Sequence, residues 1–248
     1  MLEPKHLRNP PIVEAAIALD VTPPINFEVK QLLKLKPLVF KDYPVDDPIS
    51  AMMSKIDFKP DGQTSTSSSP PTVIGYRFFS SDKLFVAQVR PDVFSFSRLK
   101  PYTTWENLKG EARKFWNEYK TIVSPISTIK KISLRFINRL EFTLPSQTTD
   151  YLTHPPRSPS ELQGFVTGFL SQINLHDAES GIDSTIIQFL EPQTKPEFAS
   201  LILDIQVSKQ IDYAVDETRI WDTLDLLRAM KNRIFFSSIT EKTFRMCE

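Results

Sequence analysis

The strongest constraint on the fold is a long alternation of apolar and polar residues over residues 131–144. Every even position from 132 to 144 is apolar except Asn138. Successive residues of a strand point to opposite faces of a sheet, so this period of two predicts a long half-buried strand. A buried amide without partners costs about 1 to 3 kcal/mol, so Asn138 is expected to hold neighbouring backbone in place or to serve a site.

Shorter segments predict further strands around this one. Residues 13–21 alternate in the same way, and strands are also predicted near residues 51–59, 73–80, 184–191 and 199–209. Two β-rich runs on either side of Pro91 and Asp92 suggest a tight antiparallel connection. The Ser/Pro-rich segment 61–72 is predicted to be a mobile surface loop.

Capping signals predict the helices. Thr103 and Glu106 have capping-box spacing and precede an apolar helical stripe that ends near Ile122, and Asp216 is placed to cap a long closing helix. A second capping box at 158–161 predicts a helix with an apolar stripe over 162–173. A short helix after Asn26 is expected to end before Pro37.

The order of these elements repeats, which favours an α+β fold of two halves, 1–124 and 125–248. Each half is expected to be a mainly antiparallel sheet covered by one long amphipathic helix. Trp105 with Leu108 would then correspond to Trp221 with Leu224, consistent with duplication. The alternative stays open that the halves pack as one domain and that the Trp and Leu spacing is common to amphipathic helices.

Composition excludes several classes of protein. The six glycines are scattered at 62, 75, 110, 164, 168 and 181, so no glycine-rich phosphate cradle is present. The sequence has no apolar stretch of signal-peptide or membrane-spanning length, and its single cysteine, Cys247, has no intrachain partner. A reducing compartment, the cytoplasm, is therefore expected.

Charge is balanced overall but divided along the chain. The chain has 30 Lys and Arg and 30 Asp and Glu. Residues 98–140 hold ten basic and three acidic residues, whereas residues 177–225 hold three basic and eleven acidic ones. The basic region could bind nucleic acid, but we expect it to meet the acidic region, within the fold or across a homodimer.

No catalytic or metal-binding motif stands out. The histidines His6, His154 and His176 lack metal-ligand spacing, so no metal and no cofactor are predicted. Two Ser-x-x-Lys matches, at 80–83 and 127–130, lack companion motifs. Asp204 and Lys209 would lie on opposite faces of their strand, which disfavours a metal-dependent nuclease centre.

Arg135 and Arg139 share one face of the 131–144 strand, opposite to the face of Asn138. They could form a small anion-binding row, or they could pair with Asp204 on a neighbouring strand. The second arrangement is the favoured one.

Several blocks together resemble a sporadically distributed, functionally unassigned bacterial family of about this length. They are NPPIVEAAIALDV, SFSRLKPYTTWENL, WNEY, ISLRFINRLEF and LLRAMKNRIFFSSIT, and they span nearly the whole chain. The resemblance implies no reaction, but patchy occurrence points to a mobile-element or defence-associated context. On these blocks the candidate binding residues are Glu14, Arg98, Tyr102, Trp105, Arg135, Asn138, Arg139 and Asn232.

The sequence therefore favours a non-enzymatic binding or regulatory protein that acts through a macromolecular partner, which we expect to be a protein. One alternative is a nucleic-acid-processing enzyme with a site around Arg135, Asn138 and Asp204. Another is a sensor of small anions or nucleotides. No membrane association is expected.

Overall fold

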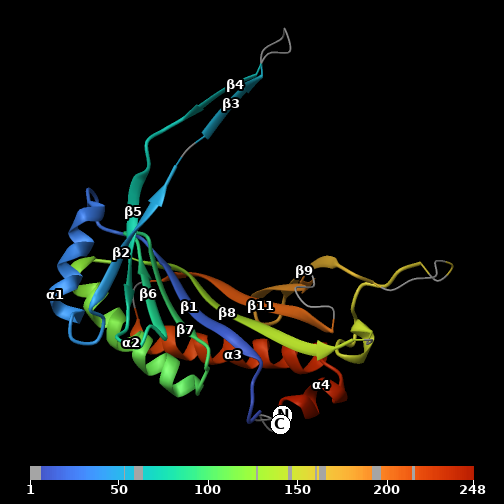
Figure 1. The fold of residues 1–248 in the computed structure, drawn as a ribbon. Helices are drawn as coiled ribbons and strands as arrows, with labels where there is room; N and C mark the ends of the chain where they lie inside the picture. The colour runs from blue at the N-terminus through green and yellow to red at the C-terminus, as the bar shows by residue number, and fades with distance from the viewer. Residues whose placement is uncertain are drawn as a thin grey trace.

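One nine-stranded antiparallel sheet dominates the structure (Figure 1). A computed structural model describes residues 7–52, 54–58, 64–126, 128–144, 147–159, 161, 166–191, 197–213 and 216–248. The sheet order is β2-β5-β6-β7-β1-β8-β11-β10-β9, and β3 and β4 form a separate two-stranded sheet. The strands are β1 Ile12–Val21, β2 Val45–Ala51, β3 Ser54–Phe58, β4 Thr64–Ser68, β5 Thr72–Phe79, β6 Phe85–Val89, β7 Val93–Leu99, β8 Ile129–Thr143, β9 Phe169–Asp177, β10 Ile182–Leu190 and β11 Phe198–Tyr213. The helices are η1 Val29–Lys34, α1 Leu35–Val39, α2 Trp105–Ile122, η2 Thr148–Asp150, α3 Glu217–Ser238 and α4 Glu241–Met246.

The sequence predicted two sheets, one in each half of the chain and each covered by its own helix. This prediction is wrong, because strands from both sides of the predicted boundary at 124/125 belong to one sheet. β1 lies at its centre and pairs with β7 on one side and with β8 on the other. Each of the two sheets would have left one of these strands with an unpaired edge, and joining β1 to β8 satisfies the hydrogen-bonding groups of both. The periodicity of single strands carries no information about this long-range pairing.

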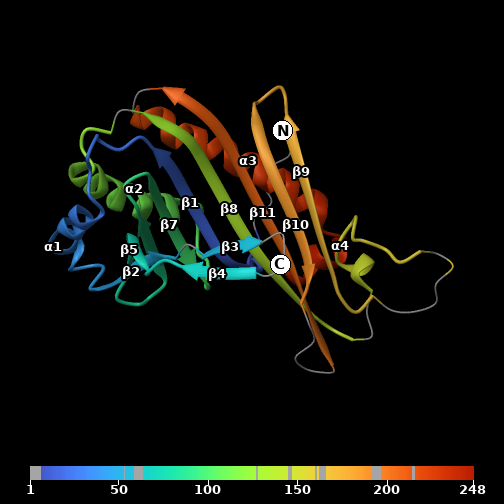
Figure 2. The same cartoon turned by 90° about the horizontal axis from the view of Figure 1, so that it is seen from above.

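Both long helices cover the same face of the sheet, and no helix among the described residues covers the other face, which we call the open face (Figures 1 and 2). α2 packs on β6 and β7, and α3 packs on β8 and β11. Large side chains of α2 are fully buried there, with the rings of Trp116 and Phe94 5.3 Å apart. The predicted alternation of β8 is confirmed, since its even residues from Ile132 to Phe142 are all buried.

A two-stranded arm projects from the sheet beyond β2 and β5 (Figure 1). The sequence predicted a loop over 61–72, but residues 64–68 form β4 and pair with β3. Residues 61–63 lie outside the described residues. Backbone hydrogen bonds to β3 therefore hold this Ser- and Thr-rich segment in a strand, although its composition alone predicts a loop.

Two helix predictions are corrected. Residues 169–173 belong to β9, which pairs with β10 along its whole length, whereas residues 162–165 lie outside the described residues. The helical turn before β2 also continues through Pro37, because this residue lies in the first turn of α1, where a helix needs no N–H from it. Asp216 caps α3 as predicted, and Thr104, one residue after Thr103, caps α2.

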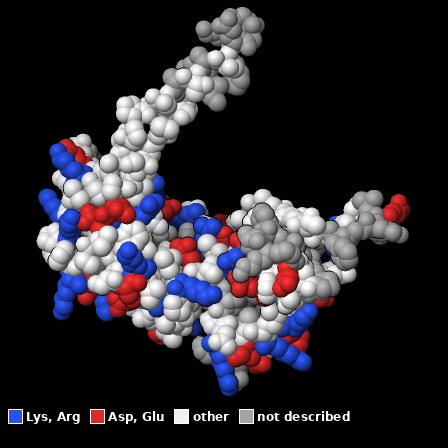
Figure 3. Space-filling model, viewed as in Figure 1, with Lys and Arg blue, Asp and Glu red and all other residues white. Residues whose placement is uncertain are grey.

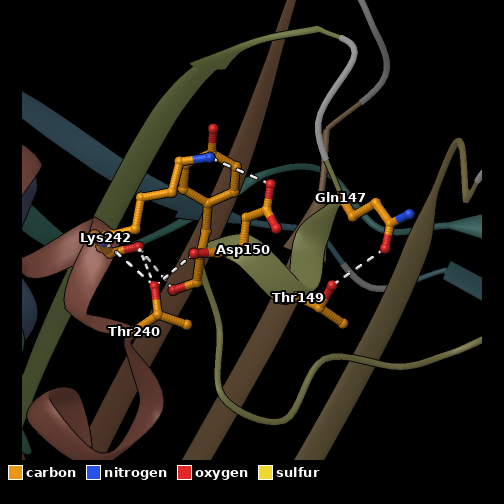
Figure 4. A network of polar contacts seen from close by, with 7 residues as sticks. Gln147, Thr149, Asp150, Thr240 and Lys242 are labelled. Carbon is orange, nitrogen blue, oxygen red and sulfur yellow. Dashed lines mark hydrogen bonds and ion pairs between the residues drawn. The ribbon is translucent and has the colours of Figure 1, made fainter.

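The segment after β8 is fastened to the end of the chain (Figure 4). The Thr240 hydroxyl donates to the carbonyl of Asp150 at 2.5 Å, and the ammonium of Lys242 lies 3.2 Å from the Asp150 carboxylate. The Thr243 hydroxyl donates to the carbonyl of Tyr151 at 2.7 Å. These bonds hold α4 against η2. Among the described residues, no helix is long and apolar enough to cross a membrane.

Candidate functional site

A cavity of about 140 Å³ lies between the start of α2, the middle of β8 and the second half of α3. A single water needs about 10 to 15 Å³ of such space, so the cavity has room for a ligand of several heavy atoms. Its lining residues combine aromatic and proline walls with a few polar groups: Leu7, Pro10, Pro11, Ile12, Tyr102, Thr103, Thr104, Trp105, Glu106, Phe136, Asn138, Arg228, Lys231, Asn232, Phe235 and Phe236. This mixture is typical of small-molecule sites.

Lys231 is the most unusual residue of this cavity. Its side chain comes from the buried face of α3, and the residue is only 8% exposed. Its Nζ lies 4.0 Å from the centre of the Phe136 ring, and it makes no hydrogen bond or ion pair within the described part of the chain. Burial first, and then the charge of Arg228, lowers the pKa of Lys231 to about 7. A buried amine without an acidic partner is costly, and such groups concentrate at functional sites.

Asn138 and Tyr102 form the wall next to Lys231. Asn138 is 2% exposed, and its Nδ2 donates to the carbonyl of Leu203 at 2.9 Å. This bond confirms that the amide ties down neighbouring backbone, as the sequence suggested. The Tyr102 ring packs edge-on against Phe136 with ring centres 5.6 Å apart, and burial raises the pKa of its phenol.

The start of α2 forms another side of the cavity. Thr104 caps this helix by accepting from the N–H of Asn107. The N–H groups of a helix's first turn lack intrahelical acceptors and carry partial positive charge. Arg228 adds a full positive charge, stacked 5.6 Å from the Trp105 ring centre, and Glu106 lies 3.6 Å from Arg228 across the two helices. The cavity is thus positive, with one carboxylate among its lining residues.

The other candidate residues from the sequence lie elsewhere. Glu14, Arg135 and Arg139 belong to β1 and β8 and share the open face of the sheet, because Asn138 and the cavity lie on the covered face. The Arg98 side chain is buried under the sheet, where its Nε donates to the carbonyl of Pro101 at 3.1 Å. The structure therefore brings together Tyr102, Trp105, Asn138 and Asn232, but not the whole set.

The favoured pairing with Asp204 is confirmed for Arg135 but not for Arg139. Arg135 binds Asp204 with two nitrogens, its NH2 group at 2.5 Å, and Arg139 lies 2.9 Å from Glu191. The binding of Arg135 to Asp204 takes place on the face opposite to Asn138, so the three residues proposed for a nuclease-like centre do not converge.

Pairs between the two charged regions extend beyond the sheet. Lys109 lies 2.6 Å from Asp225, and Lys120 pairs with Glu217, so α2 and α3 are also linked by opposite charges. Figure 3 shows basic and acidic side chains interspersed over the visible body. The basic region 98–140 thus meets the acidic region 177–225 within the fold, as expected from the sequence.

The sequence analysis missed Lys231 and Arg228. Lys231 stands at a position of the apolar stripe of α3, four residues after Leu227 and three before Ile234. A charged residue in such a stripe is the signal that could have identified it. Within the described residues, no group of three His, Cys, Asp or Glu side chains is placed to hold a metal ion.

Comparison with known proteins adds no assignment. No family model matches the chain, and no curated protein matches it significantly.

Proposed function

We propose that the chain is a binding protein for a small organic anion, held in the cavity between α2, β8 and α3. The observation that carries this proposal is the buried amine of Lys231, which has no carboxylate partner among the residues that the structure describes. An anion placed beside it would supply the missing counter-charge and stabilise the protonated amine. Anion recognition is thus assigned to Lys231 and not to Arg135 and Arg139, because these two arginines already pair with carboxylates.

The walls of the cavity favour a particular kind of anion. Phe136, Phe235 and Tyr102 offer flat apolar surface, whereas Asn232 offers an amide group. A ligand with one anionic end and a compact flat body would fill both parts. A small aromatic carboxylate has this chemistry, and inorganic phosphate tests the charge without the body.

Calorimetric titration with benzoate and with phosphate tests the proposal. We expect benzoate to bind once per chain at pH 6 to 7. Above pH 7 the free amine loses its proton, so the affinity falls by roughly tenfold per pH unit. Binding at pH 8 should take up a proton, which appears as a dependence of the measured heat on the ionisation enthalpy of the buffer.

Two variants make the result specific. Lys231→Met should abolish binding, whereas Lys34→Met removes an equal charge from the exposed end of η1 and should leave binding unchanged. If Lys231→Met binds benzoate as well as the unchanged protein does, the proposal is wrong. The same conclusion follows if neither probe, nor a panel of small carboxylates and nucleoside monophosphates, shifts the melting temperature at about 10 mM.

We further propose that the protein acts in the cytoplasm. The Cys247 thiol is free and buried, which suits a reducing compartment. Fractionation of cells that express a tagged chain tests this proposal.

A further inference from the structure

The two outer strands of the nine-stranded sheet differ in how they are protected. β2 carries Pro48 and the acidic pair Asp46 and Asp47, and its pairing with β5 contains a register shift between Ile49 and Ser50. Proline, charge and bulges are the devices by which proteins stop an exposed edge from pairing with another chain. The β2 edge is thus closed to further strands.

β9, the outer strand at the opposite side of the sheet (Figure 2), has none of these devices. It pairs with β10 over nine consecutive residues without a register shift. Between Phe169 and His176 it contains no proline and no Asp, Glu, Lys or Arg. Its one carboxylate, Asp177, stands at the end of the strand and binds the Ser180 hydroxyl at 3.0 Å.

β9 also leaves apolar side chains uncovered. Ile173 is 42% exposed and Leu175 is 51% exposed. Their pairing partners on β10, Ile186 and Ser184, are buried on the same face of the sheet. Leu170, on the other face, is 71% exposed. Apolar residues along an unprotected strand edge indicate a surface that another strand covers.

The sequence of β9 is complementary to itself. If two copies of β9 pair antiparallel about a two-fold axis at Ile173, the two Ile173 side chains meet at the centre. Gln172 then lies opposite Asn174 of the second copy, which matches amide with amide on the open face. Ser171 lies opposite Leu175 of the second copy, so that small and large side chains alternate along the covered face.

We propose that β9 is a dimerisation strand, and that two copies of this chain join their sheets edge to edge into one continuous sheet. The occupant of the edge is a second copy because positions 171 to 175 match under the two-fold operation, whereas at the ends Leu170 lies opposite His176 and Phe169 opposite Asp177. The proposal is independent of anion binding, since no residue of β9 lines the cavity.

Sedimentation velocity and light scattering test the proposal on the full chain. We expect twice the chain mass of 28.5 kDa. Because Ile173 meets its own copy, Ile173→Lys and Ile173→Glu each place like charges at the axis. Each variant should raise the dissociation constant at least tenfold. An equimolar mixture of the two variants should restore a dimer, since each interface then contains one Lys and one Glu.

Leu226→Lys is the matched control, because Leu226 is a 58% exposed apolar residue of α3 away from β9, and its dimer should persist. Circular dichroism checks that each variant is folded. Hydrogen exchange should also show β9 amides becoming more protected as protein concentration rises. A wild-type chain that remains monomeric at about 100 μM would overturn the proposal. So would a dimer that both Ile173 variants leave intact, or a mixture that fails to re-associate.

Discussion

Replacing Lys231 by methionine should stabilise the protein at neutral pH and flatten the pH dependence of its stability. In the folded chain the pKa of Lys231 is about 7, against 10.5 for an ordinary lysine. The unfolded chain therefore binds more protons than the folded chain between these pH values, so the free energy of unfolding rises with pH there. One pKa unit corresponds to about 1.4 kcal/mol. Burying this amine, either without its proton or desolvated, therefore lowers the free energy of unfolding by roughly 4 kcal/mol at pH 7 and by roughly 2 kcal/mol at pH 9.

These magnitudes set the expected measurements. Between pH 7 and 9 the wild-type unfolding free energy should rise by about 2 kcal/mol, which corresponds to roughly 4 to 8 °C in melting temperature. Lys231→Met keeps the length of the side chain and removes the charge, so it should gain about 2 to 4 kcal/mol at pH 7 and lose this rise. The other charged residues that line the cavity are Arg228, on the same helix as Lys231, and Glu106 on α2.

Urea titrations at pH 6, 7, 8 and 9 would measure these quantities for the wild type, for Lys231→Met and for the surface control Lys34→Met. The unfolding free energy of the control should rise with pH as it does in the wild type, because Lys34 is exposed. The reasoning fails if Lys231→Met destabilises the protein at pH 7 with an unchanged slope, since the ammonium would then have a favourable environment in the folded chain.

Three further predictions concern packing, the arm and the ion pairs. Trp116→Ala should cost about 3 to 5 kcal/mol in a urea titration, because Trp116 is fully buried between α2 and the sheet. Replacing residues 53–69 by a short Gly-containing turn should change the melting temperature by less than about 2 °C, since within the described part of the chain β3 and β4 pair only with each other and project away from the nine-stranded sheet (Figure 1). Arg135→Met should cost about 2 to 4 kcal/mol by leaving the buried Asp204 unpaired, and adding Asp204→Leu should recover most of this loss; a double variant as unstable as the single one would contradict the pairing argument.

Periodicity and capping predicted the elements that are stabilised locally. β1, β8 and α2 appear where the alternation and the helical stripe place them, and Asp216 caps α3 as expected. The residues Tyr102, Trp105, Asn138 and Asn232 were likewise singled out by sequence blocks and meet in one cavity.

The remaining features depend on tertiary contacts. β2 contains Pro48 and two aspartates, so its own sequence opposes a strand, and only pairing with β5 makes it one. Residues 169–173 fit a helical stripe and a strand equally well until β10 selects the strand. Lys231 was not among the candidates because its burial depends on β8, which is distant in sequence from α3.

The central position of β1 has a consequence for how the chain is made. β1 leaves the ribosome well before its neighbour β8, because Ala15 pairs with Phe136, which is synthesised about 120 residues later. Pairing at such separation is slow because a long loop must close first. During synthesis the β8-facing edge of β1 therefore stays unpaired until the second half appears. A chain truncated near residue 124 would keep that edge permanently open, and we expect it to aggregate unless the 125–248 fragment is produced beside it.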